Sequence, residues 1–369
     1  EPCSATVTGP NALNEAVVPS YSNNVSAGTA SANANYAGTL NYLASSDAKT
    51  FAIGKASLTL SVGNSPATFN GGQQAATIVA TGPAGTVAGT ASNISYDSSA
   101  VAPTNAGTYA VLADFAPGDT TNYNSVAGGN AGSFIIQPAA TTTAVTCAAG
   151  PFIYNGTVFE PCSAVATGPG GLNQALTVVY LDNLNAGTAS ASASFDGTPN
   201  YQASSGSTTF PIAKATPTLS ITGASPTYDG TQHGATVVGS VAGTVSNIQY
   251  DASATEPTNA GTYAVSADFV PTDAVNYNSL VNASAGSFVI NKATPTLSVT
   301  NSPVDYDGTP KAANVSGSVG GTVSNITYNG SPTQPIGPGT FGVNADFTPT
   351  DVVNYNTLTN SPAGNFVIQ

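Results

Sequence analysis

Apolar and polar residues alternate along many short segments of this chain, which predicts β-strands. In residues 262–269 every second position is apolar, namely Tyr263, Val265, Ala267 and Phe269. Residues 109–115 and 341–347 show the same alternation. A period of two places one set of side chains on a single face, as in a half-buried strand. Because no segment shows a sustained helical period, the pattern predicts an all-β protein.

The predicted strands and turns recur in the same order five times along the 369 residues. Three longer copies run over 55–137, 214–291 and 292–369, and two cysteine-bearing copies run over 1–54 and 138–213. Every copy ends in a Phe-x-Ile strand, after which the next copy begins at once. This spacing indicates a tandem array of small domains that abut as a semi-rigid rod, without a flexible linker.

Glycine-containing turns bound many of the predicted strands. Asp-Gly or Asn-Gly pairs at 155–156, 196–197, 229–230 and 307–308 supply the positive backbone dihedrals of tight hairpins. About six or seven short strands in each complete copy favour a small immunoglobulin-like antiparallel β-sandwich. Helix-poor β-grasp units are the alternative fold that the pattern leaves open.

A set of short motifs marks each longer copy. In the fourth copy they are Lys-Ala-Thr-Pro-Thr-Leu-Ser at 214–220, Tyr228-Asp229-Gly230, Ala-Gly-Thr-Tyr at 260–263 and Asn276-Tyr277-Asn278. This order resembles the MBG/YDG-type repeats of bacterial surface adhesins and fibrous secreted proteins, closely in the three longer copies and loosely in the other two. The resemblance implies a secreted array and transfers no catalytic residue. The last copy departs from the pattern, because Ile336-Gly337-Pro338-Gly339 replaces its Asn-Ala-Gly turn.

Composition narrows the class of partner. Only 6% of the residues are charged, and Arg, Trp and Met are absent. The net charge of −13 comes from 18 dispersed acids against five lysines, which argues against nucleic acid as a partner. A surface that is polar but nearly without charge favours assembly of the chain with copies of itself, head-to-tail. Cell-surface or matrix glycans are the other class of partner that such a surface allows. No apolar run is long enough to predict a membrane span.

Two of the three cysteines are placed to pair. Cys147 and Cys162 bracket one predicted strand-turn-strand. A disulfide between them would contribute about 3 kcal/mol by chain entropy. Because such bonds persist outside the cytosol, we expect a secreted protein, extracellular or at the cell surface. The chain opens at Glu1 without a basic and apolar leader, so we expect any secretion signal to have been removed or to lie outside this sequence.

The first copy lacks an opening segment. Residues 1–5 repeat the Glu-Pro-Cys-Ser-Ala of residues 160–164, but only the later motif is preceded by a segment such as 138–159. A sandwich without its edge strand exposes unpaired backbone groups, so we expect another strand to fill that edge. Either the chain continues a longer periodic polypeptide or a neighbouring copy donates the strand, and Cys3 bonds to it. A free thiol at Cys3 is the alternative.

The sequence predicts no catalytic, cofactor or metal site, and we expect a protein that is not an enzyme. His233, the one histidine, follows a predicted turn and has a lysine counterpart in the next copy, so we expect an exposed loop residue. Asp305 and Asp307 flank a turn and make a poor hydrolytic pair. Three equivalent loops could offer oxygen ligands to calcium, but a single carboxylate in each provides little charge, and aspartate commonly caps turns. These loops contain Asp119, Asp273 and Asp351.

Three further recurring positions each allow two interpretations. Lysines at the copy junctions could cross-link to asparagine, but we expect surface spacers. Aspartates on the outward face of a predicted strand are expected to discourage edge pairing. A recurring tyrosine is expected to be a corner residue, with a packed ring and a backbone hydrogen bond, rather than part of a ligand-stacking stripe. The residues are Lys55, Lys214 and Lys292; Asp114, Asp268 and Asp346; and Tyr42, Tyr123, Tyr201, Tyr277 and Tyr355.

Taken together, the repeat, the near absence of charge and the incomplete first copy favour a structural role. We expect a subunit or segment of an extracellular fibre, built from tandem β-sandwiches and joined head-to-tail. The alternative is the stalk of a bacterial cell-surface adhesin that presents a separate ligand-binding head.

Overall fold

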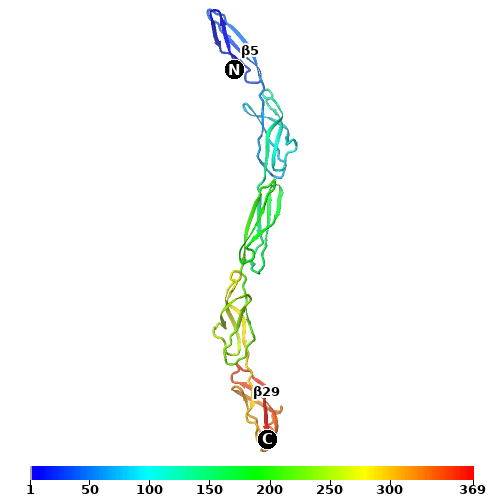
Figure 1. The fold of residues 1–369 in the computed structure, drawn as a ribbon, viewed down its shortest axis with the longest axis vertical. Coiled ribbons are helices and arrows are strands. Elements are labelled where there is room, and N and C mark those ends of the chain that lie inside the picture. The colour runs from blue at the N-terminus through cyan, green and yellow to red at the C-terminus, as the bar shows by residue number, and fades with distance from the viewer. Residues whose placement is uncertain (1) are drawn as a thin grey trace. The chain divides into compact units, whose positions relative to one another are not determined.

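The computed structural model describes residues 2–369, and strands follow one another along the chain (Figure 1). Among these residues the one helical element is a 3-10 turn, η1 (Pro169–Gly171). The all-β expectation is therefore confirmed. We call the five sequence copies modules 1 to 5, in chain order. Glu1, which begins the first predicted copy, lies outside the described residues.

Two compact units divide the chain, and the division passes through module 3. The first unit holds the residues up to Ala148 with Pro161–Leu181 and Ser190–Thr209, and the second holds Ala149–Glu160, Asp182–Ala189 and Phe210–Gln369. Modules 1 and 2 therefore belong to the first unit, and modules 4 and 5 belong to the second. Every module contains two small sheets.

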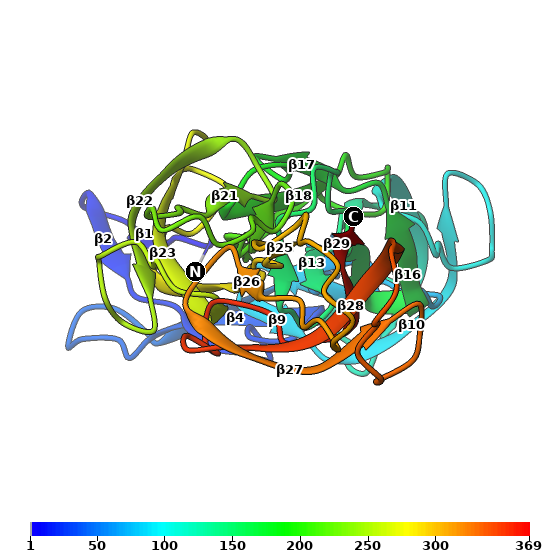
Figure 2. The same ribbon diagram turned by 90° about the horizontal axis from the view of Figure 1, so that it is seen from below.

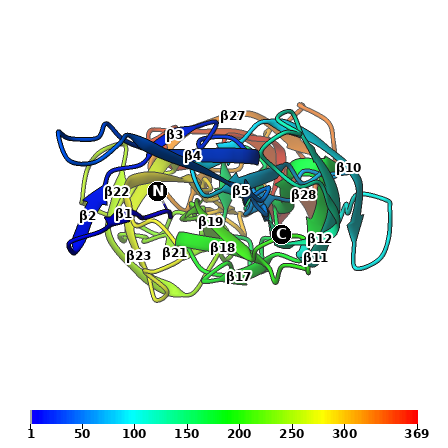
Figure 3. The same ribbon diagram turned by 90° about the horizontal axis from the view of Figure 1, so that it is seen from above.

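Module 1 has a two-stranded and a three-stranded sheet, whose strands are labelled in Figure 3. The hairpin of its last two strands pairs regularly from Gly28↔Ile53 to Tyr36↔Ser45. Its fully buried apolar side chains, among residues 2–54, are only Ala30 and Ala32, so its core is thin. The strands are β1 (Ala5–Gly9), β2 (Leu13–Val17), β3 (Ser20–Ser22), β4 (Gly28–Tyr36) and β5 (Ser45–Ile53).

Module 2 has larger side chains in its core. Phe134 and Ile136 alternate with outward residues on the last strand, and Tyr96 packs on Phe134 while its hydroxyl accepts the Ala76 N–H at 2.7 Å. Burial of these side chains contributes to the hydrophobic stabilisation of the module. The strands are β6 (Thr59–Val62), β7 (Ala67–Thr68), β8 (Ile78–Gly82), β9 (Gly85–Val87), β10 (Gly89–Tyr96), β11 (Gly107–Pro117) and β12 (Val126–Gln137).

Module 3 shows a complete cysteine-bearing copy. Its sheets have the strand orders β13-β15-β16 and β14-β19-β18-β17. Its opening segment contributes one strand to each sheet, β13 and then β14. The strands are β13 (Thr142–Cys147), β14 (Phe152–Ile153), β15 (Cys162–Gly168), β16 (Leu172–Leu176), β17 (Val179–Leu181), β18 (Gly187–Phe195) and β19 (Ser204–Ala213).

Modules 4 and 5 share one pattern of pairing, and Figure 2 labels the strands of module 5 in orange to dark red. The predicted alternation over 262–269 is confirmed, since Val265, Ala267 and Phe269 are at most 2% exposed. The strands of module 4 are β20 (Leu219–Thr222), β21 (Thr236–Gly239), β22 (Gly243–Tyr250), β23 (Gly261–Pro271) and β24 (Leu280–Ile290). Those of module 5 are β25 (Leu297–Val299), β26 (Val315–Gly317), β27 (Gly321–Tyr328), β28 (Gly339–Pro349) and β29 (Leu358–Ile368).

One feature of the sheets differs from the purely antiparallel expectation. The short strand β7 pairs in parallel with the last strand of its module, β12, and β14 pairs in the same way with β19. Each of these strands is only two residues long, so alternation of residue type could not reveal it. In this way the opening segment of a module reaches the sheet that contains its last strand.

The recurring strand aspartates have a different role from the one expected. Asp268 lies on β23, the central strand of its sheet, and its carboxylate accepts hydrogen bonds from Asn247 Nδ2 at 2.6 Å and the Asn282 N–H at 2.7 Å. Asn247 has a φ of 52° where the register shifts. The aspartate therefore fastens a β-bulge and does not protect a free edge. Asp114 and Asp346 make the equivalent bonds in modules 2 and 5.

Candidate functional site

Successive modules meet through a recurring set of residues that we call the joint. At the boundary of modules 4 and 5, the side chain of Asn354 is 6% exposed. Its Oδ1 accepts a hydrogen bond from the Ala260 N–H at 2.6 Å, and its Nδ2 donates to Asn259 Oδ1 at 3.2 Å. One buried amide group from the later module therefore satisfies the turn of the earlier module.

The loop that carries Asn354 is fastened within its own module. Asp351 Oδ2 accepts a hydrogen bond from Asn354 Nδ2 at 2.7 Å, and Asp351 Oδ1 accepts the backbone N–H groups of Val353 and Asn354, both at 3.1 Å. These bonds, led by that of the Asn354 side chain, lower the pKa of Asp351 below its ordinary value. Lys292 Nζ donates to the carbonyl oxygen of Val352 at 2.6 Å. These bonds hold the side-chain amide of Asn354 in the orientation in which it contacts the neighbouring module.

The same hydrogen bond recurs at every module boundary, twice within each compact unit. The asparagine Oδ1 accepts an alanine N–H at 2.7 or 2.8 Å in the other three joints. The donor and acceptor pairs are Ala27 and Asn122, Ala106 and Asn200, and Ala186 and Asn276. Two of these asparagines also donate across the joint, Asn200 to Asn105 Oδ1 at 3.0 Å and Asn276 to Asn185 Oδ1 at 3.2 Å.

An aromatic pair accompanies the amide group in three joints. Tyr355 of module 5 meets Tyr228 of module 4 edge-to-face, with ring centroids 5.4 Å apart and planes at 84°. Tyr277 meets Tyr154 with the same values, and Tyr201 meets Phe69 at 5.2 Å and 82°. Edge-to-face pairs contribute about 0.5–1.5 kcal/mol beyond area burial. The tyrosine of the Tyr-Asp-Gly motif is therefore a joint residue.

The corner-tyrosine interpretation describes only part of the role of these residues. In modules 1 and 3 the hydroxyl does bond the backbone, Tyr42 to the Pro10 carbonyl at 2.9 Å and Tyr201 to the Pro169 carbonyl at 2.7 Å. Sequence reasoning missed the ring partner in the neighbouring module. The signal was available, because two aromatic motifs recur in each complete copy and neither has a catalytic neighbour.

The end of module 5 lacks half of a joint. Pro338 stands where module 4 has Ala260, and Gly337 stands where it has Asn259. Proline has no N–H and glycine has no side-chain amide, so neither hydrogen bond to a following asparagine can form. Tyr306, the counterpart of Tyr228, is 52% exposed. This end therefore presents an aromatic ring without the polar groups that accompany it elsewhere.

The two cysteine sites of modules 1 and 3 differ in their covering strand. Cys147 and Cys162 face each other across β13 and β15 and form a disulfide with an S–S distance of 2.01 Å. The expected bond is therefore present. Cys3, at the position equivalent to Cys162, is a half-buried free thiol in this structure.

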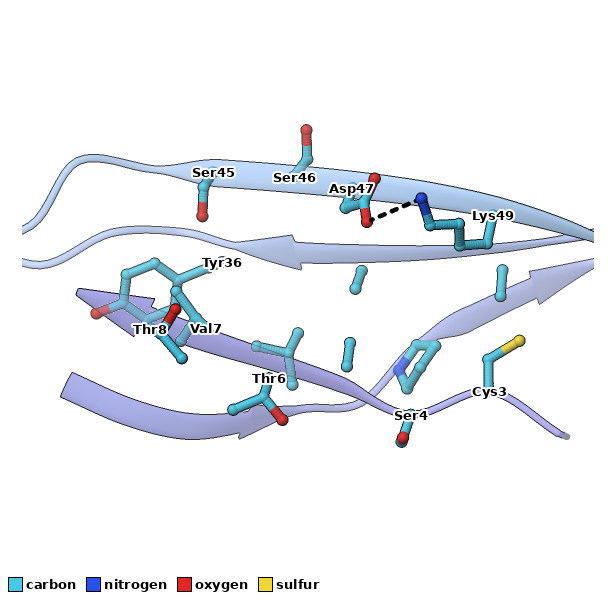
Figure 4. Close-up of a pocket in the computed structure, with 15 residues that line it drawn as sticks. Cys3, Ser4, Thr6, Val7, Thr8, Tyr36, Ser45, Ser46, Asp47 and Lys49 are labelled. Atoms are coloured by element: carbon cyan, nitrogen blue, oxygen red, sulfur yellow. Dashed lines mark ion pairs between the residues drawn. The ribbon is translucent and has the colours of Figure 1, made fainter. Parts of the chain in front are cut away.

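A groove runs along module 1 beside Cys3 (Figure 4). It has a volume of about 430 Å³ and lies between the residues of β1 and those of β5. Asp47 and Lys49 line it from β5 and form an ion pair at 3.8 Å. The hydroxyl oxygen of Tyr36 is buried here without a hydrogen-bond partner among the described residues.

The remaining candidate residues have local partners. The His233 imidazole is 20% exposed and bonds Asp229 Oδ1 at 3.1 Å, so it is more covered than expected. At the equivalent place Lys311 pairs with Asp307, and this bond, together with the hydrogen bonds from Thr309, lowers the pKa of Asp307 from 3.8 to about 2. The junction lysines Lys55 and Lys214, like Lys292, donate to loop carbonyl oxygens.

Residues 2–369 contain neither a metal-binding cluster nor a membrane-spanning helix. No group of three or more His, Cys, Asp or Glu side chains lies close enough to hold a metal ion. No helix within these residues has the length and apolar character needed to cross a membrane. The carboxylates considered for calcium, in the Asp119, Asp273 and Asp351 loops, bond the asparagine three residues later.

Comparison with known families identifies the class of protein. The MBG domain model matches residues 56–140, 217–294 and 295–369, which is more than half of the chain. The chain therefore belongs to the MBG domain family, whose repeats occur in surface and secreted repeat proteins. No curated protein sequence matches it.

Proposed function

We propose that this chain is a structural segment of an extracellular fibre, in which the joint fixes each module to the next. The chain associates head-to-tail with copies of itself, either as a continuous polypeptide or through a strand that completes module 1. In this proposal the array carries no catalytic activity. Its partners are protein modules rather than small substrates.

The observation that supports the proposal is the recurrence of the joint at four boundaries. A flexible tether would leave the asparagine amide and the turn N–H in water, whereas each joint satisfies both groups internally. With about 1 kcal/mol for each hydrogen bond and about 0.5–1.5 kcal/mol for a ring pair, opening a complete joint costs about 2–4 kcal/mol. That free energy keeps a joint closed most of the time, as a structural array requires.

A second candidate function is favoured by the end of module 5. Because Pro338 and Gly337 remove the joint donors, a further MBG module would dock there without the hydrogen bonds made elsewhere. The adjoining element in this case is of another kind, as in a stalk that presents a separate binding head. Both candidates use the array as a spacer and differ in what it meets at this end.

Electron microscopy of the purified chain and of native material tests both candidates. We expect isolated chains to have one well-defined length, and a variant carrying Asn276→Ala and Tyr277→Ala to bend at one boundary. Asn278→Ala is the matched control, because that half-buried side chain bonds only Lys214 and Thr216 of its own module. Wild-type chains as variable in length as the double variant would contradict the structural proposal. Periodic filaments in native material favour the fibre, and monodisperse particles with a distinct head favour the stalk.

A further inference from the structure

The joint of modules 2 and 3 contains a close contact between two backbones. The turn at residues 69–72 of module 2 lies against the loop of module 3 that forms η1. A Cβ built on Gly170 of this loop would lie 2.8 Å from the Cα of Gly71, and one built on Gly71 would lie closer still to the Cα of Gly170. Side chains do not approach backbone so closely, so the two segments can meet in this way because both residues are glycine.

The same turn recurs in modules 3 and 4, where nothing lies against it so closely. Gly71 has a φ of 85°, and its counterparts Gly156 and Gly230 have φ values of 79° and 85°. A Cβ on either counterpart would meet nothing within 4 Å. At the joint of modules 3 and 4 there is instead a cleft of about 430 Å³, lined by Tyr154 of module 3 and Val241 of module 4. The difference therefore comes from the loop that docks on the turn.

The glycine loop of module 3 is linked to the other residues of its joint. The Pro169 carbonyl oxygen accepts a hydrogen bond from the Tyr201 hydroxyl at 2.7 Å, and the Tyr201 ring meets the Phe69 ring edge-to-face. Phe69 is 6% exposed, whereas its tyrosine counterparts in modules 3 and 4 are half-buried. Because Asn200 precedes Tyr201, a shift of the loop reaches both the ring pair and the joint amide.

Module 1 has the same loop with side chains in place of the two glycines. Asn11 and Ala12 stand where module 3 has Gly170 and Gly171. Their φ values of 58° and 63° are positive, like the 69° and 86° of the glycines. The loop is also fastened in the same way, since the Tyr42 hydroxyl donates to its proline carbonyl at 2.9 Å. Placed as η1 is placed, this loop would therefore press the Cβ of Asn11 against the turn of module 2.

We propose that Gly170 determines which module docks behind module 2, and that the turn of module 2 accepts a cysteine-bearing module with glycine at this position. Module 3 fits this turn, and module 1, which has Asn11 there, does not. The two cysteine-bearing modules are therefore not interchangeable, and the joints themselves encode part of the order of the array. The proposal rests on the proposed function, since it names the partner that one structural joint selects.

The selection works through a clash with the wrong module. Specificity between similar partners often comes from such a repulsive contact rather than from an added attraction. A side chain at either glycine separates the two backbones, and this separation draws the Tyr201 ring away from Phe69. It also draws Asn200 Oδ1 away from the Ala106 N–H, which donates to it at 2.7 Å. One additional Cβ therefore weakens the whole joint.

Gly170→Asn in the full chain copies module 1 and tests the selection. Asparagine adopts a positive φ more readily than most residues, so the substitution changes the contact more than the backbone. We expect amide hydrogen exchange of the Ala106 N–H to become about tenfold faster, while the amides of β15 keep their protection. Gly171→Asn is the matched control and should leave the rate unchanged, because Gly171 also has a positive φ but open space around it.

Gly71→Asn approaches the same contact from module 2, so the test does not depend on the fold of module 3. It should accelerate exchange at Ala106 as Gly170→Asn does. Its control is Gly230→Asn at the joint of modules 4 and 5, where the glycine has the same φ and nothing within 4 Å of an added Cβ. Exchange of the Ala260 N–H, the donor of that joint, should not change.

Asn200→Ala separates this proposal from the function on which it rests. It removes the acceptor of the Ala106 N–H and should accelerate exchange there whatever the role of Gly170. If Asn200→Ala acts but the substitutions at Gly170 and Gly71 do not, the joint stands and the selection is overturned. An equal acceleration by Gly171→Asn would overturn the selection as well. If Asn200→Ala has no effect, the joint does not hold the two modules and the structural function itself fails.

Discussion

Replacement of the buried asparagine at the boundary of modules 4 and 5 tests the joint most directly. Asn354→Ala removes the acceptor of the Ala260 N–H at 2.6 Å and the donor to Asn259 at 3.2 Å. An unpaired buried donor costs about 1–3 kcal/mol, and two net hydrogen bonds of about 1 kcal/mol each give a similar figure. The substitution also removes the bond from Asn354 Nδ2 to Asp351 Oδ2 inside module 5, whereas the fold of module 4, which holds the Ala260 N–H, does not depend on Asn354.

Amide hydrogen exchange of the full chain measures this loss at the Ala260 N–H, which is the donor of the hydrogen bond. If opening of the joint exposes the Ala260 N–H, a loss of about 1–3 kcal/mol accelerates its exchange about 5–150-fold. The amide of Val343, on a central strand of module 5, should keep its protection. The matched control is Asn356→Ala, because the side-chain amide of the half-buried Asn356 bonds only Lys292 and Thr294 of its own module.

Two results would refute the reasoning. Unchanged exchange at Ala260 in a folded Asn354→Ala chain would mean that the hydrogen bond across the boundary does not hold the modules together. An equal acceleration by Asn356→Ala would mean that any change in this loop loosens it, without a specific role for the buried amide.

Three further outcomes follow from particular contacts. Hydrogen bonds, led by that of Lys311, lower the pKa of Asp307 in the folded chain to about 2 from 3.8. The stability that its charged form contributes is therefore present above about pH 4 and is lost as the pH falls toward 2. Asp307→Asn should make Tm depend less on pH over that window. Reduction of Cys147–Cys162, whose positions are 15 residues apart, should lower the free energy of unfolding of module 3 by about 3 kcal/mol, and unchanged urea midpoints in Cys147→Ser would disagree. Gly206→Ala places a Cβ 2.3 Å from a carbonyl oxygen and should cost about 1–3 kcal/mol, whereas Gly54→Ala, with open space around it, should cost much less in the same thermal melts.

Much of the fold could be predicted because its signals are local. The alternation that ends at Phe269 and the Asp-Gly turn at Gly230 depend on neighbours only a few residues away, so they identify strands and hairpins without tertiary information. The pairing of Cys147 with Cys162 followed from their positions around one turn. The parallel strands β7 and β14 could not be found in this way, because two residues show no period.

The candidate site was harder to predict because its residues have ordinary local patterns. An Asn-Tyr pair in a loop is typical of a turn cap and a corner tyrosine, and Tyr355 fitted that interpretation. The strand pattern predicted a solvated charge at Asp268. The β-bulge that Asp268 fastens depends on side-chain hydrogen bonds, which the alternation of residue types does not show. The groove of module 1 could not be predicted from the sequence either, although comparison with residues 138–159 showed that the first copy lacks an opening segment.

The sequence by itself determined the strand class, the five-fold repeat, the cysteine pair and the membership of a repeat family, because each depends on spacing along the chain. Only the tertiary structure decided that Asn354 and Tyr355 join two modules. Their partners, Ala260 and Tyr228, are remote in sequence, the first by 94 residues. A hydrogen bond of 2.6 Å between such distant groups depends on how two folded modules dock, which no local pattern encodes.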